Sequence, residues 1–136
     1  MKTVLVTGGS RGIGKSISTT LSKNHHVVVG YVNSEDKAIE VVKEITEAGG
    51  NANIIEIDIS NKESVDNAFS VIEDAYGSVD ILINNAGITK DNILPRMKEE
   101  DWLDVIQTNL TGSFYTSQRA IKQMMKNKWG RIIFIS

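Results

Sequence analysis

The sequence predicts an α/β fold in which helices cover both faces of a doubly wound parallel β-sheet. Five short apolar runs rich in β-branched residues are separated by longer segments whose apolar residues recur at helical spacing. The runs are continuous rather than alternating, which is typical of strands buried on both faces of a parallel sheet. Regular alternation of strand and helix then favours three layers: helix, sheet and helix.

The composition indicates one domain over residues 1–136. The chain is 40% hydrophobic and 24% charged, and its formal net charge is −2. This balance argues against a protein that binds nucleic acid or a membrane surface. The absence of cysteine excludes disulfides, thiolate catalysis and cysteine metal sites. The first apolar stretch, residues 3–7, is too short for a signal peptide or a membrane span, so we expect a cytoplasmic protein.

The elements are predicted to follow one another in regular order along the chain. The strands are expected at residues 3–7, 26–32, 53–58, 79–84 and 131–136. The helices are expected at residues 13–23, 34–48, 61–76 and 110–127, and a further helix has Glu99, Glu100 and Asp101 in its first turn. Asn33 and Ser34 are N-cap candidates for the second helix, and Ser60 or Asn61 for the third.

Two features of these elements lead to specific expectations about exposure. In the last helix, four residues predict one amphipathic stripe: Leu110, Phe114, Ile121 and Met125. His25 and His26 are neighbours at the start of a strand, so their side chains point to opposite faces. We therefore expect two solvated histidines there and no metal site.

A glycine-rich segment, Thr7-Gly8-Gly9-Ser10-Arg11-Gly12-Ile13-Gly14, joins the first strand to the first helix. Glycine permits a positive φ and lets a phosphate approach without a Cβ in the way. The free N–H groups and the dipole of the following helix also favour phosphate. A plain tight turn would use glycine too, but this position in the first strand–helix unit favours a dinucleotide. The predicted cofactor-binding residues are Thr7, Gly8, Ser10, Arg11, Gly12, Ile13 and Gly14.

The spacing of this loop resembles that of the short-chain dehydrogenase/reductase family, and three further segments agree with it. Asn84-Asn85-Ala86-Gly87 follows the fourth strand, Asp58 ends the third strand, and Thr108-Asn109-Leu110 precedes the last helix. The resemblance covers the whole chain and implies a Rossmann fold with strand order 3-2-1-4-5. It implies that Asn109 is a catalytic residue, which bends the long helix and holds a water of a proton relay. It also implies that further residues bind the cofactor, with Asp58 at the adenine: Asp58, Ile59, Asn85, Ala86 and Gly87.

The end of the second strand bears on the choice between NAD and NADP. Many NAD-binding proteins place an acid there for the ribose hydroxyls, but this chain has Tyr31. Arg11 stands where NADP-preferring members of the family carry a base, and a guanidinium binds a 2′-phosphate in bidentate fashion. Asn33 and Ser34 add neutral hydrogen-bonding groups, so we predict NADP(H). In the alternative, Arg11 is a solvated loop charge and Glu35 serves the ribose.

The segment from Asn85 to Leu94, with Arg96, Met97 and Trp102, resembles the β-ketoacyl-(acyl-carrier-protein) reductases of fatty-acid synthesis. Acetoacetyl-CoA reductases share part of this pattern. The resemblance implies that NADPH reduces a 3-oxoacyl thioester, with acyl carrier protein as a candidate partner, and that full-length members are homo-oligomers. The family docks its carrier on a basic patch, which corresponds here to Lys126, Lys128 and Arg131. Cations at the end of a helix also complement its dipole, which is the alternative for these residues.

The serine and the Tyr-x-x-x-Lys motif of the family are missing from this sequence. The residues four positions after Tyr31, Tyr76 and Tyr115 are Glu35, Asp80 and Arg119. By the family pattern the catalytic serine would follow Ser136, and a shift of one residue would make Ser136 that serine. We therefore expect a truncated chain that lacks the family's last strands and helices, with its fifth strand as an open edge and no catalysis by itself. The alternatives are a non-catalytic NADP-binding fragment and a nonfunctional remnant.

Overall fold

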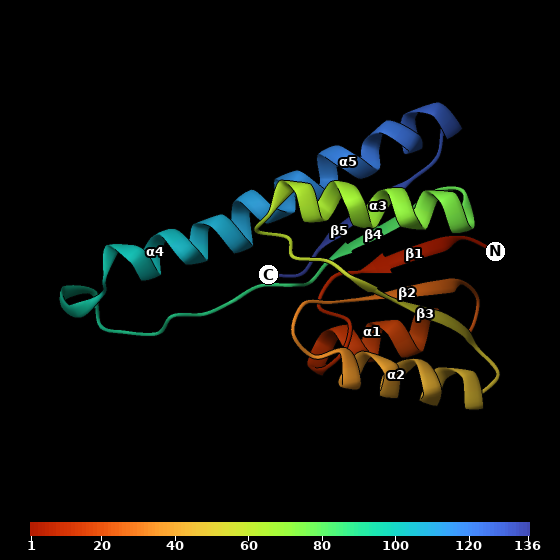
Figure 1. The fold of residues 1–136 in the computed structure, drawn as a ribbon, viewed down its shortest axis with the longest axis horizontal. Coiled ribbons are helices and arrows are strands. Elements are labelled where there is room, and N and C mark those ends of the chain that lie inside the picture. The colour runs from red at the N-terminus through yellow and green to blue at the C-terminus, as the bar shows by residue number, and fades with distance from the viewer.

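A five-stranded parallel sheet runs through the computed structural model, which describes all residues from Met1 to Ser136 (Figure 1). The strand order is β3-β2-β1-β4-β5, as predicted from the sequence. Every neighbouring pair of strands is parallel. Strand β3 starts and ends earlier than expected, and β4 starts later. The strands are β1 (Thr3–Val6), β2 (His26–Tyr31), β3 (Asn51–Glu56), β4 (Ile81–Asn84) and β5 (Arg131–Phe134).

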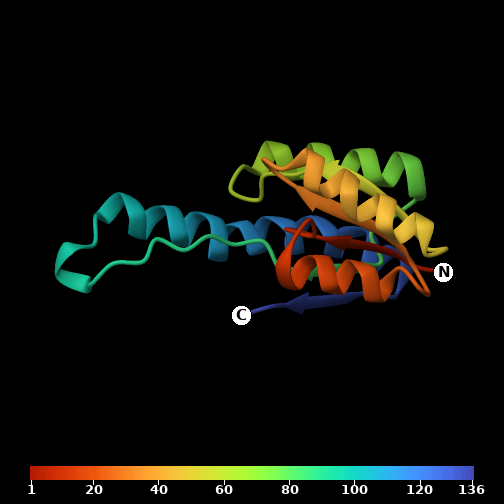
Figure 2. The same ribbon diagram turned by 90° about the horizontal axis from the view of Figure 1, so that it is seen from below.

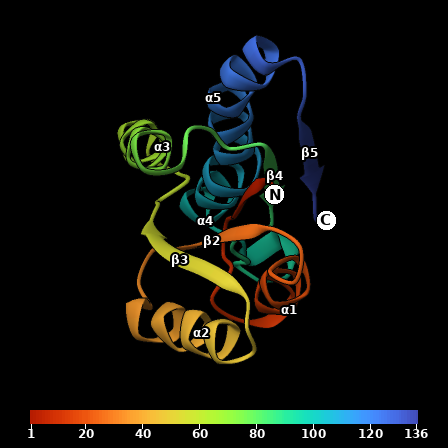
Figure 3. The ribbon, with the colours of Figure 1, turned by 90° about the vertical axis from the view of Figure 1, so that its right-hand side faces the viewer.

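Helices cover both faces of this sheet (Figure 1, Figure 3). Helices α1 (Gly12–Leu21) and α2 (Glu35–Glu47) lie on one face, and α3 (Lys62–Tyr76) and α5 (Gly112–Asn127) lie on the other. Three shorter elements precede α5: η1 (Leu94–Arg96), α4 (Glu99–Val105) and the π-helical segment η2 (Ile106–Thr111). The side chain of Asn61 caps α3 by accepting a hydrogen bond from Ser64 N, whereas Ser34 stands at the N-cap of α2 without such a bond.

The central strand shows why the apolar runs are continuous. Val4 and Val6 pack in the cluster under α1 and α2, while Leu5 packs in the cluster under α3 and α5. All three side chains are fully buried. Because successive residues of a strand point to opposite faces, a strand covered on both sides needs an apolar residue at every position. Each such side chain contributes about 1.5–3 kcal/mol through its burial.

The stripe predicted for the last helix faces solvent. Leu110, Phe114, Ile121 and Met125 are all exposed, and the residues of α5 that are buried are Gly112, Thr116, Ala120 and Met124. The predicted apolar residues do share one side of the helix, but the side of α5 that packs inward is a different one. A small residue lets α5 approach the turn after β3 closely: a Cβ on Gly112 would lie 2.9 Å from the carbonyl oxygen of Ile59. Close approach, rather than hydrophobicity, therefore decides which side of α5 faces inward.

The expectation of two solvated histidines is wrong for His26. This side chain is buried, and its Nε2 lies 2.7 Å from Asn53 Oδ1 on the neighbouring strand. Its ring packs against Tyr76 at the end of α3, with a centroid distance of 4.3 Å. The end of α3 therefore covers the start of β2, a contact between distant segments that the local sequence does not indicate.

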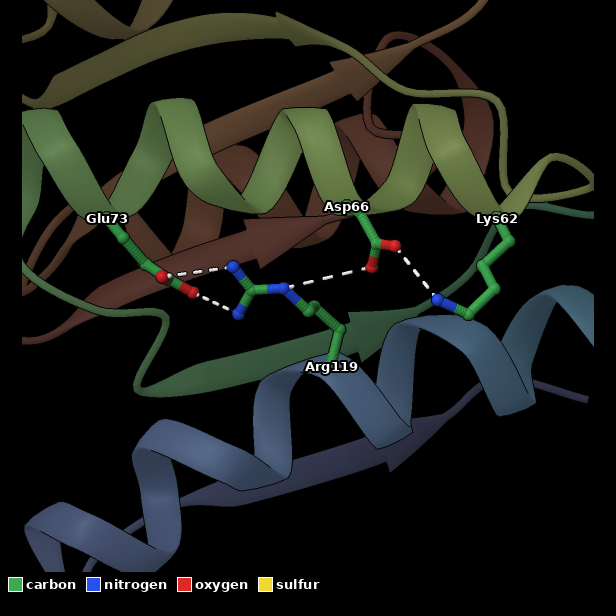
Figure 4. Close-up of polar contacts among 4 residues, drawn as sticks. All are labelled: Lys62, Asp66, Glu73 and Arg119. Carbon is green, nitrogen blue, oxygen red and sulfur yellow. Dashed lines mark hydrogen bonds and ion pairs between the residues drawn. The ribbon is translucent and has the colours of Figure 1, made fainter.

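A charged contact joins α3 to α5 (Figure 4). Arg119 of α5 donates to both carboxylate oxygens of Glu73, with Nη2 3.1 Å from Oε2, and its Nε lies 3.8 Å from Asp66 Oδ1. Lys62 is 2.9 Å from the other oxygen of Asp66. A hydrogen bond from Lys62 is the main reason that the pKa of the Asp66 carboxyl lies below its ordinary value. Only 17% of the Arg119 side chain and 16% of the Glu73 side chain is exposed, so this pair is largely enclosed between the helices.

The segment between β4 and α5 extends away from the sheet (Figure 1, Figure 2). It carries η1 and α4, neither of which has a buried residue. Its exposed large apolar side chains are Ile93, Leu94, Trp102, Leu103 and Leu110. No helix of the structure combines the length and the hydrophobicity that crossing a membrane requires.

Removing the charge of Glu73 should weaken the contact between α3 and α5. In Glu73→Gln a mostly buried guanidinium loses the closer of its two anionic partners, and we expect the free energy of unfolding to fall by about 1–3 kcal/mol. Urea unfolding followed by circular dichroism measures this change. Asp74→Asn is the control, because the neighbouring Asp74 is exposed and forms no ion pair, and it should cost less than about 0.5 kcal/mol. Equal losses in the two variants would contradict a role for the ion pair.

Candidate functional site

A cavity of about 490 Å³ opens at the carboxyl ends of the strands. Loops that follow β1, β2, β3 and β4 contribute to its wall, together with Ile88 and Thr108. Convergence at this edge follows from the parallel sheet, because all its strands end on the same side. The predicted cofactor residues that line the cavity are Gly8, Ser10, Arg11, Asn33, Ser34, Asp58, Ile59, Asn85, Ala86 and Gly87. Four others do not line it: Thr7, Gly12, Ile13 and Gly14.

Thr7 lies beneath the cavity and joins the loops after β1 and β4. Its hydroxyl oxygen accepts hydrogen bonds from the N–H groups of Asn85 and Ala86, at 3.1 and 3.0 Å. The same hydroxyl donates to the carbonyl oxygen of Ile83. The side-chain amide of Asn85 returns the contact by donating to the carbonyl of Gly8 at 3.0 Å. These bonds hold the two loops side by side, and they engage the Thr7 hydroxyl fully.

The glycine-rich loop has the shape that a phosphate group needs. Gly8 and Gly12 have φ angles of +62° and +56°, in the left-handed region that favours glycine. Helix α1 begins at Gly12, so the N–H groups of its first turn have no acceptor within the helix. A Cβ on Gly12 would meet no atom within 4 Å, so the side-chain position of this residue is open. N–H groups without an acceptor at a helix N-terminus suit the phosphates of a dinucleotide.

Gly14 has a different role, because it permits close packing. A Cβ on Gly14 would lie 2.5 Å from Asn85 Nδ2 and would overlap the carbonyl oxygen of Gly8. The start of α1 is therefore packed directly against the hydrogen bond that joins the two loops. The neighbouring side chain of Ile13 is exposed.

The end of β2 presents neutral and cationic groups to the cavity. Arg11 is exposed, forms no ion pair, and lines the same cavity as Tyr31, Asn33 and Ser34. Glu35 does not line it. Burial is the main cause that raises the pKa of the Tyr31 hydroxyl, and the Glu35 carboxylate adds to the effect. Asp58, across the cavity, is the only acidic residue in its wall.

The π-helical segment η2 lies where the resemblance implies a bend in the long helix. Asn109 is in this segment and its side chain pairs with the backbone of Ile88: Oδ1 accepts from the N–H at 2.8 Å and Nδ2 donates to the carbonyl at 2.9 Å. A Cβ on Gly87 would lie 2.9 Å from Asn109 Oδ1. Asn109 is thus held against the loop after β4, next to the cavity.

Two further polar residues, which the sequence analysis did not assign to the site, join its elements. Asn84 is buried, and it accepts a hydrogen bond from Thr116 at 2.6 Å and donates to Ser117 at 3.1 Å, so it ties β4 to α5. Asn84 is the last residue of β4 and precedes Asn85, which lines the cavity. Because neighbouring residues of a strand point to opposite sides, this position could have predicted that Asn84 faces away from the cavity. Gln107 of η2 donates to the carbonyl of Ser60 at 2.9 Å. No local pattern predicts that contact.

The basic residues predicted as a docking patch lie at the opposite edge of the sheet. Arg131 starts β5 and its guanidinium lies 4.7 Å from the centre of the Trp129 ring, while Lys128 ends α5 in the left-handed conformation. Lys126 is in the last turn of α5, where a cation complements the helix dipole. Lys128 and Arg131 therefore have local structural roles.

Comparisons with known proteins agree with this geometry. A family model described as short chain dehydrogenase matches residues 2–136. A 3-oxoacyl-[acyl-carrier-protein] reductase of Staphylococcus epidermidis is 46% identical over 133 residues, which are 97% of this chain and 54% of that protein. The proteins of the same name from Staphylococcus aureus and Vibrio cholerae are 44% and 45% identical, over 99% and 97% of this chain and 55% and 53% of their own lengths. The chain spans about half the length of the curated relatives it matches.

Gly12 and Gly14 should respond differently to an added methyl group. In Gly14→Ala the Cβ overlaps the Gly8 carbonyl, so we expect the free energy of unfolding to fall by at least about 3 kcal/mol. In Gly12→Ala only the positive φ is strained, at a cost of about 1–2 kcal/mol. Urea unfolding without ligand compares them. A smaller loss for Gly14→Ala than for Gly12→Ala would show that the close packing at Gly14 is unimportant.

Proposed function

The chain belongs to the short chain dehydrogenase family, and we propose that it is the NADP(H)-binding part of a reductase of 3-oxoacyl thioesters. The names of its relatives support the substrate class. Because the chain spans about half of their length, the activity is proposed for the whole protein. A related reductase of acetoacetyl-CoA is the second candidate, and the carrier-protein names of the relatives favour the first.

The observation that carries the proposed cofactor is the wall of the cavity at the end of β2. Arg11, Asn33 and Ser34 all line the cavity, so a 2′-phosphate would meet a guanidinium and neutral hydrogen-bonding groups. Glu35, the alternative partner of the ribose, lies outside the lining. The N–H groups at the start of α1 would bind the phosphates, and Asp58 and Ile59 the adenine.

The remaining cavity residues would position the reacting end of the cofactor. Asn85, Ala86 and Gly87 follow β4, and Asn109 is held beside them through Ile88. When bound, NADPH supplies the hydride for the 3-oxo carbon. We assign Asn109 to the reaction site, where its segment of η2 would hold a water of the proton relay. The oxygen of the substrate must also gain a proton from a positioned acid.

The 136 residues do not contain the acid that the family resemblance implies. Tyr31 is the tyrosine that lines the cavity, and Glu35 rather than lysine stands four residues after it. We therefore propose that these residues bind NADPH without turning it over, and that the acid lies in residues outside them. The whole protein would act in the cytoplasm as a homo-oligomer on thioesters of acyl carrier protein.

Replacing Arg11 should weaken the binding of NADPH much more than the binding of NADH. In Arg11→Ala the 2′-phosphate loses a charge-assisted contact, so the Kd for NADPH should rise about 10–100-fold while that for NADH changes less than about twofold. Isothermal titration calorimetry measures both. Lys15→Ala is the control, because Lys15 pairs with Glu44 on α2 and does not line the cavity. If NADH binds more tightly than NADPH and Glu35→Ala weakens it, the alternative assignment of Glu35 is correct.

Turnover tests the catalytic part of the proposal. We expect the 136-residue chain to bind NADPH but to leave its absorbance unchanged when acetoacetyl-CoA or acetoacetyl carrier protein is added. Steady consumption of NADPH would contradict the claim that the acid lies elsewhere. Failure to bind NADPH at all would contradict the proposed cofactor site.

A further inference from the structure

Ser60 holds the carboxylate of Asp58 in one orientation. The carboxylate oxygen Oδ1 accepts a hydrogen bond from the Ser60 hydroxyl at 2.6 Å and another from the Ser60 N–H at 3.0 Å. No other hydrogen bond or ion pair within the chain reaches this carboxylate, so Oδ2 has no partner. Since Asp58 lines the cavity, its free oxygen is available to a ligand there.

The turn that carries both residues is itself anchored from two sides. The N–H of Asp58 donates to Ser64 Oγ of α3 at 2.9 Å, and Gln107 of η2 donates to the carbonyl of Ser60. Ile59 between them is buried, and Gly112 of α5 packs against its backbone. The hydroxyl of Ser60 therefore acts from a fixed backbone, which is what a residue needs in order to set the direction of a neighbour.

The turn presents a donor beside the free acceptor. The N–H of Ile59 has no acceptor within the chain, and Ile59 lines the same cavity as Asp58. A 6-amino purine shows the matching pair, with a donor at N6 beside an acceptor at N1. A 6-oxo purine shows the reverse, with an acceptor at O6 beside a donor at N1. The turn therefore complements the first kind of base and opposes the second.

We propose that Ser60 is a positioning residue that makes the site select a 6-amino purine over a 6-oxo purine, by keeping Oδ1 of Asp58 occupied and directing Oδ2 toward the base. This inference rests on the proposed dinucleotide function. Two donors on one oxygen fix the plane of the carboxylate, whereas the N–H alone leaves it free to turn. Loss of the Ser60 hydroxyl should therefore lower the ratio of the affinities for the two bases more than it lowers the affinity for either base.

The test is the ratio of Kd values for deamino-NADPH, which carries hypoxanthine, and NADPH, each measured by calorimetry. We expect the unaltered chain to bind deamino-NADPH about tenfold more weakly. In Ser60→Ala this ratio should fall to about threefold or less. Ser60→Thr keeps a hydroxyl and should keep the ratio. A general structural defect would weaken both ligands together and leave the ratio unchanged.

Ser78→Ala is the matched control. The Ser78 hydroxyl donates to the carboxylate of Asp80 two residues away, at 3.1 Å, but this pair lies at the opposite edge of the sheet. The variant removes the same kind of hydrogen bond far from the cavity. Its ratio of Kd values should equal that of the unaltered chain.

Asp58→Asn gives a second and independent readout. The two donors of Ser60 would hold the amide oxygen where Oδ1 now lies, so the amide nitrogen would take the place of Oδ2 and donate to O6 of hypoxanthine. The Ile59 N–H still faces the donor at N1 of hypoxanthine, so each base would make one matched and one opposed contact, and the preference for NADPH should be lost. Adding Ser60→Ala to Asp58→Asn would free the amide to turn its oxygen toward N6, so part of the preference should return. The single variant Asp58→Asn tests the two donors of Ser60 even if Ser60→Ala folds poorly.

The outcomes separate this inference from the proposed function. If the chain binds NADPH but shows equal ratios in the unaltered form and in Ser60→Ala, or binds both nucleotides equally from the start, the inference fails and the cofactor site stands. If it binds neither nucleotide, the proposed cofactor function fails, and the inference falls with it. Ratios that fall in Ser60→Ala and persist in Ser60→Thr support the positioning role.

Discussion

The structure depends on one buried hydrogen-bonded junction, in which the Thr7 hydroxyl accepts the N–H groups of Asn85 and Ala86. It joins the ends of two adjacent strands, β1 and β4, which are far apart in the sequence. Because Asn85 donates back to Gly8 and Gly14 packs against that bond, the glycine-rich loop cannot move independently of the loop after β4. A polar contact, rather than apolar packing, thus sets the floor of the cavity.

The same junction reaches the candidate reaction site through the backbone. The loop that Thr7 holds continues to Ile88, and Ile88 holds the side chain of Asn109 with both of its peptide groups. Gln107, in the same π-helical segment, reaches back to the turn after β3. The segment η2 therefore contacts both the loop after β4 and the turn after β3, and π-helical segments of this kind are frequent at functional sites.

Local patterns in the sequence predict the parallel sheet and the position of the glycine-rich loop at its edge, because these follow from strand periodicity and from loops at the ends of parallel strands. The strand order and most of the other residues that line the cavity come from the family resemblance. Local patterns do not predict the inner side of α5, where Gly112 and Thr116 are buried while Phe114 is exposed. Hydrophobic periodicity assumes that the apolar side faces inward, and close backbone approach overrides it here. The burial of His26 and the Gln107–Ser60 bond also escape prediction, because each depends on a partner distant in sequence.

The central position of β1 determines when the cavity is completed during synthesis. Of the five strands β1 is synthesised first, next to its partner β2, but its other edge has no partner until β4 has been made. Until then the Thr7 hydroxyl lacks the N–H groups that it binds in the folded chain, and the loop after β1 has nothing to pack against. The pocket is thus begun by the earliest residues of the chain and completed late in folding, so a nascent chain that ends before Asn85 has no formed site for a nucleotide.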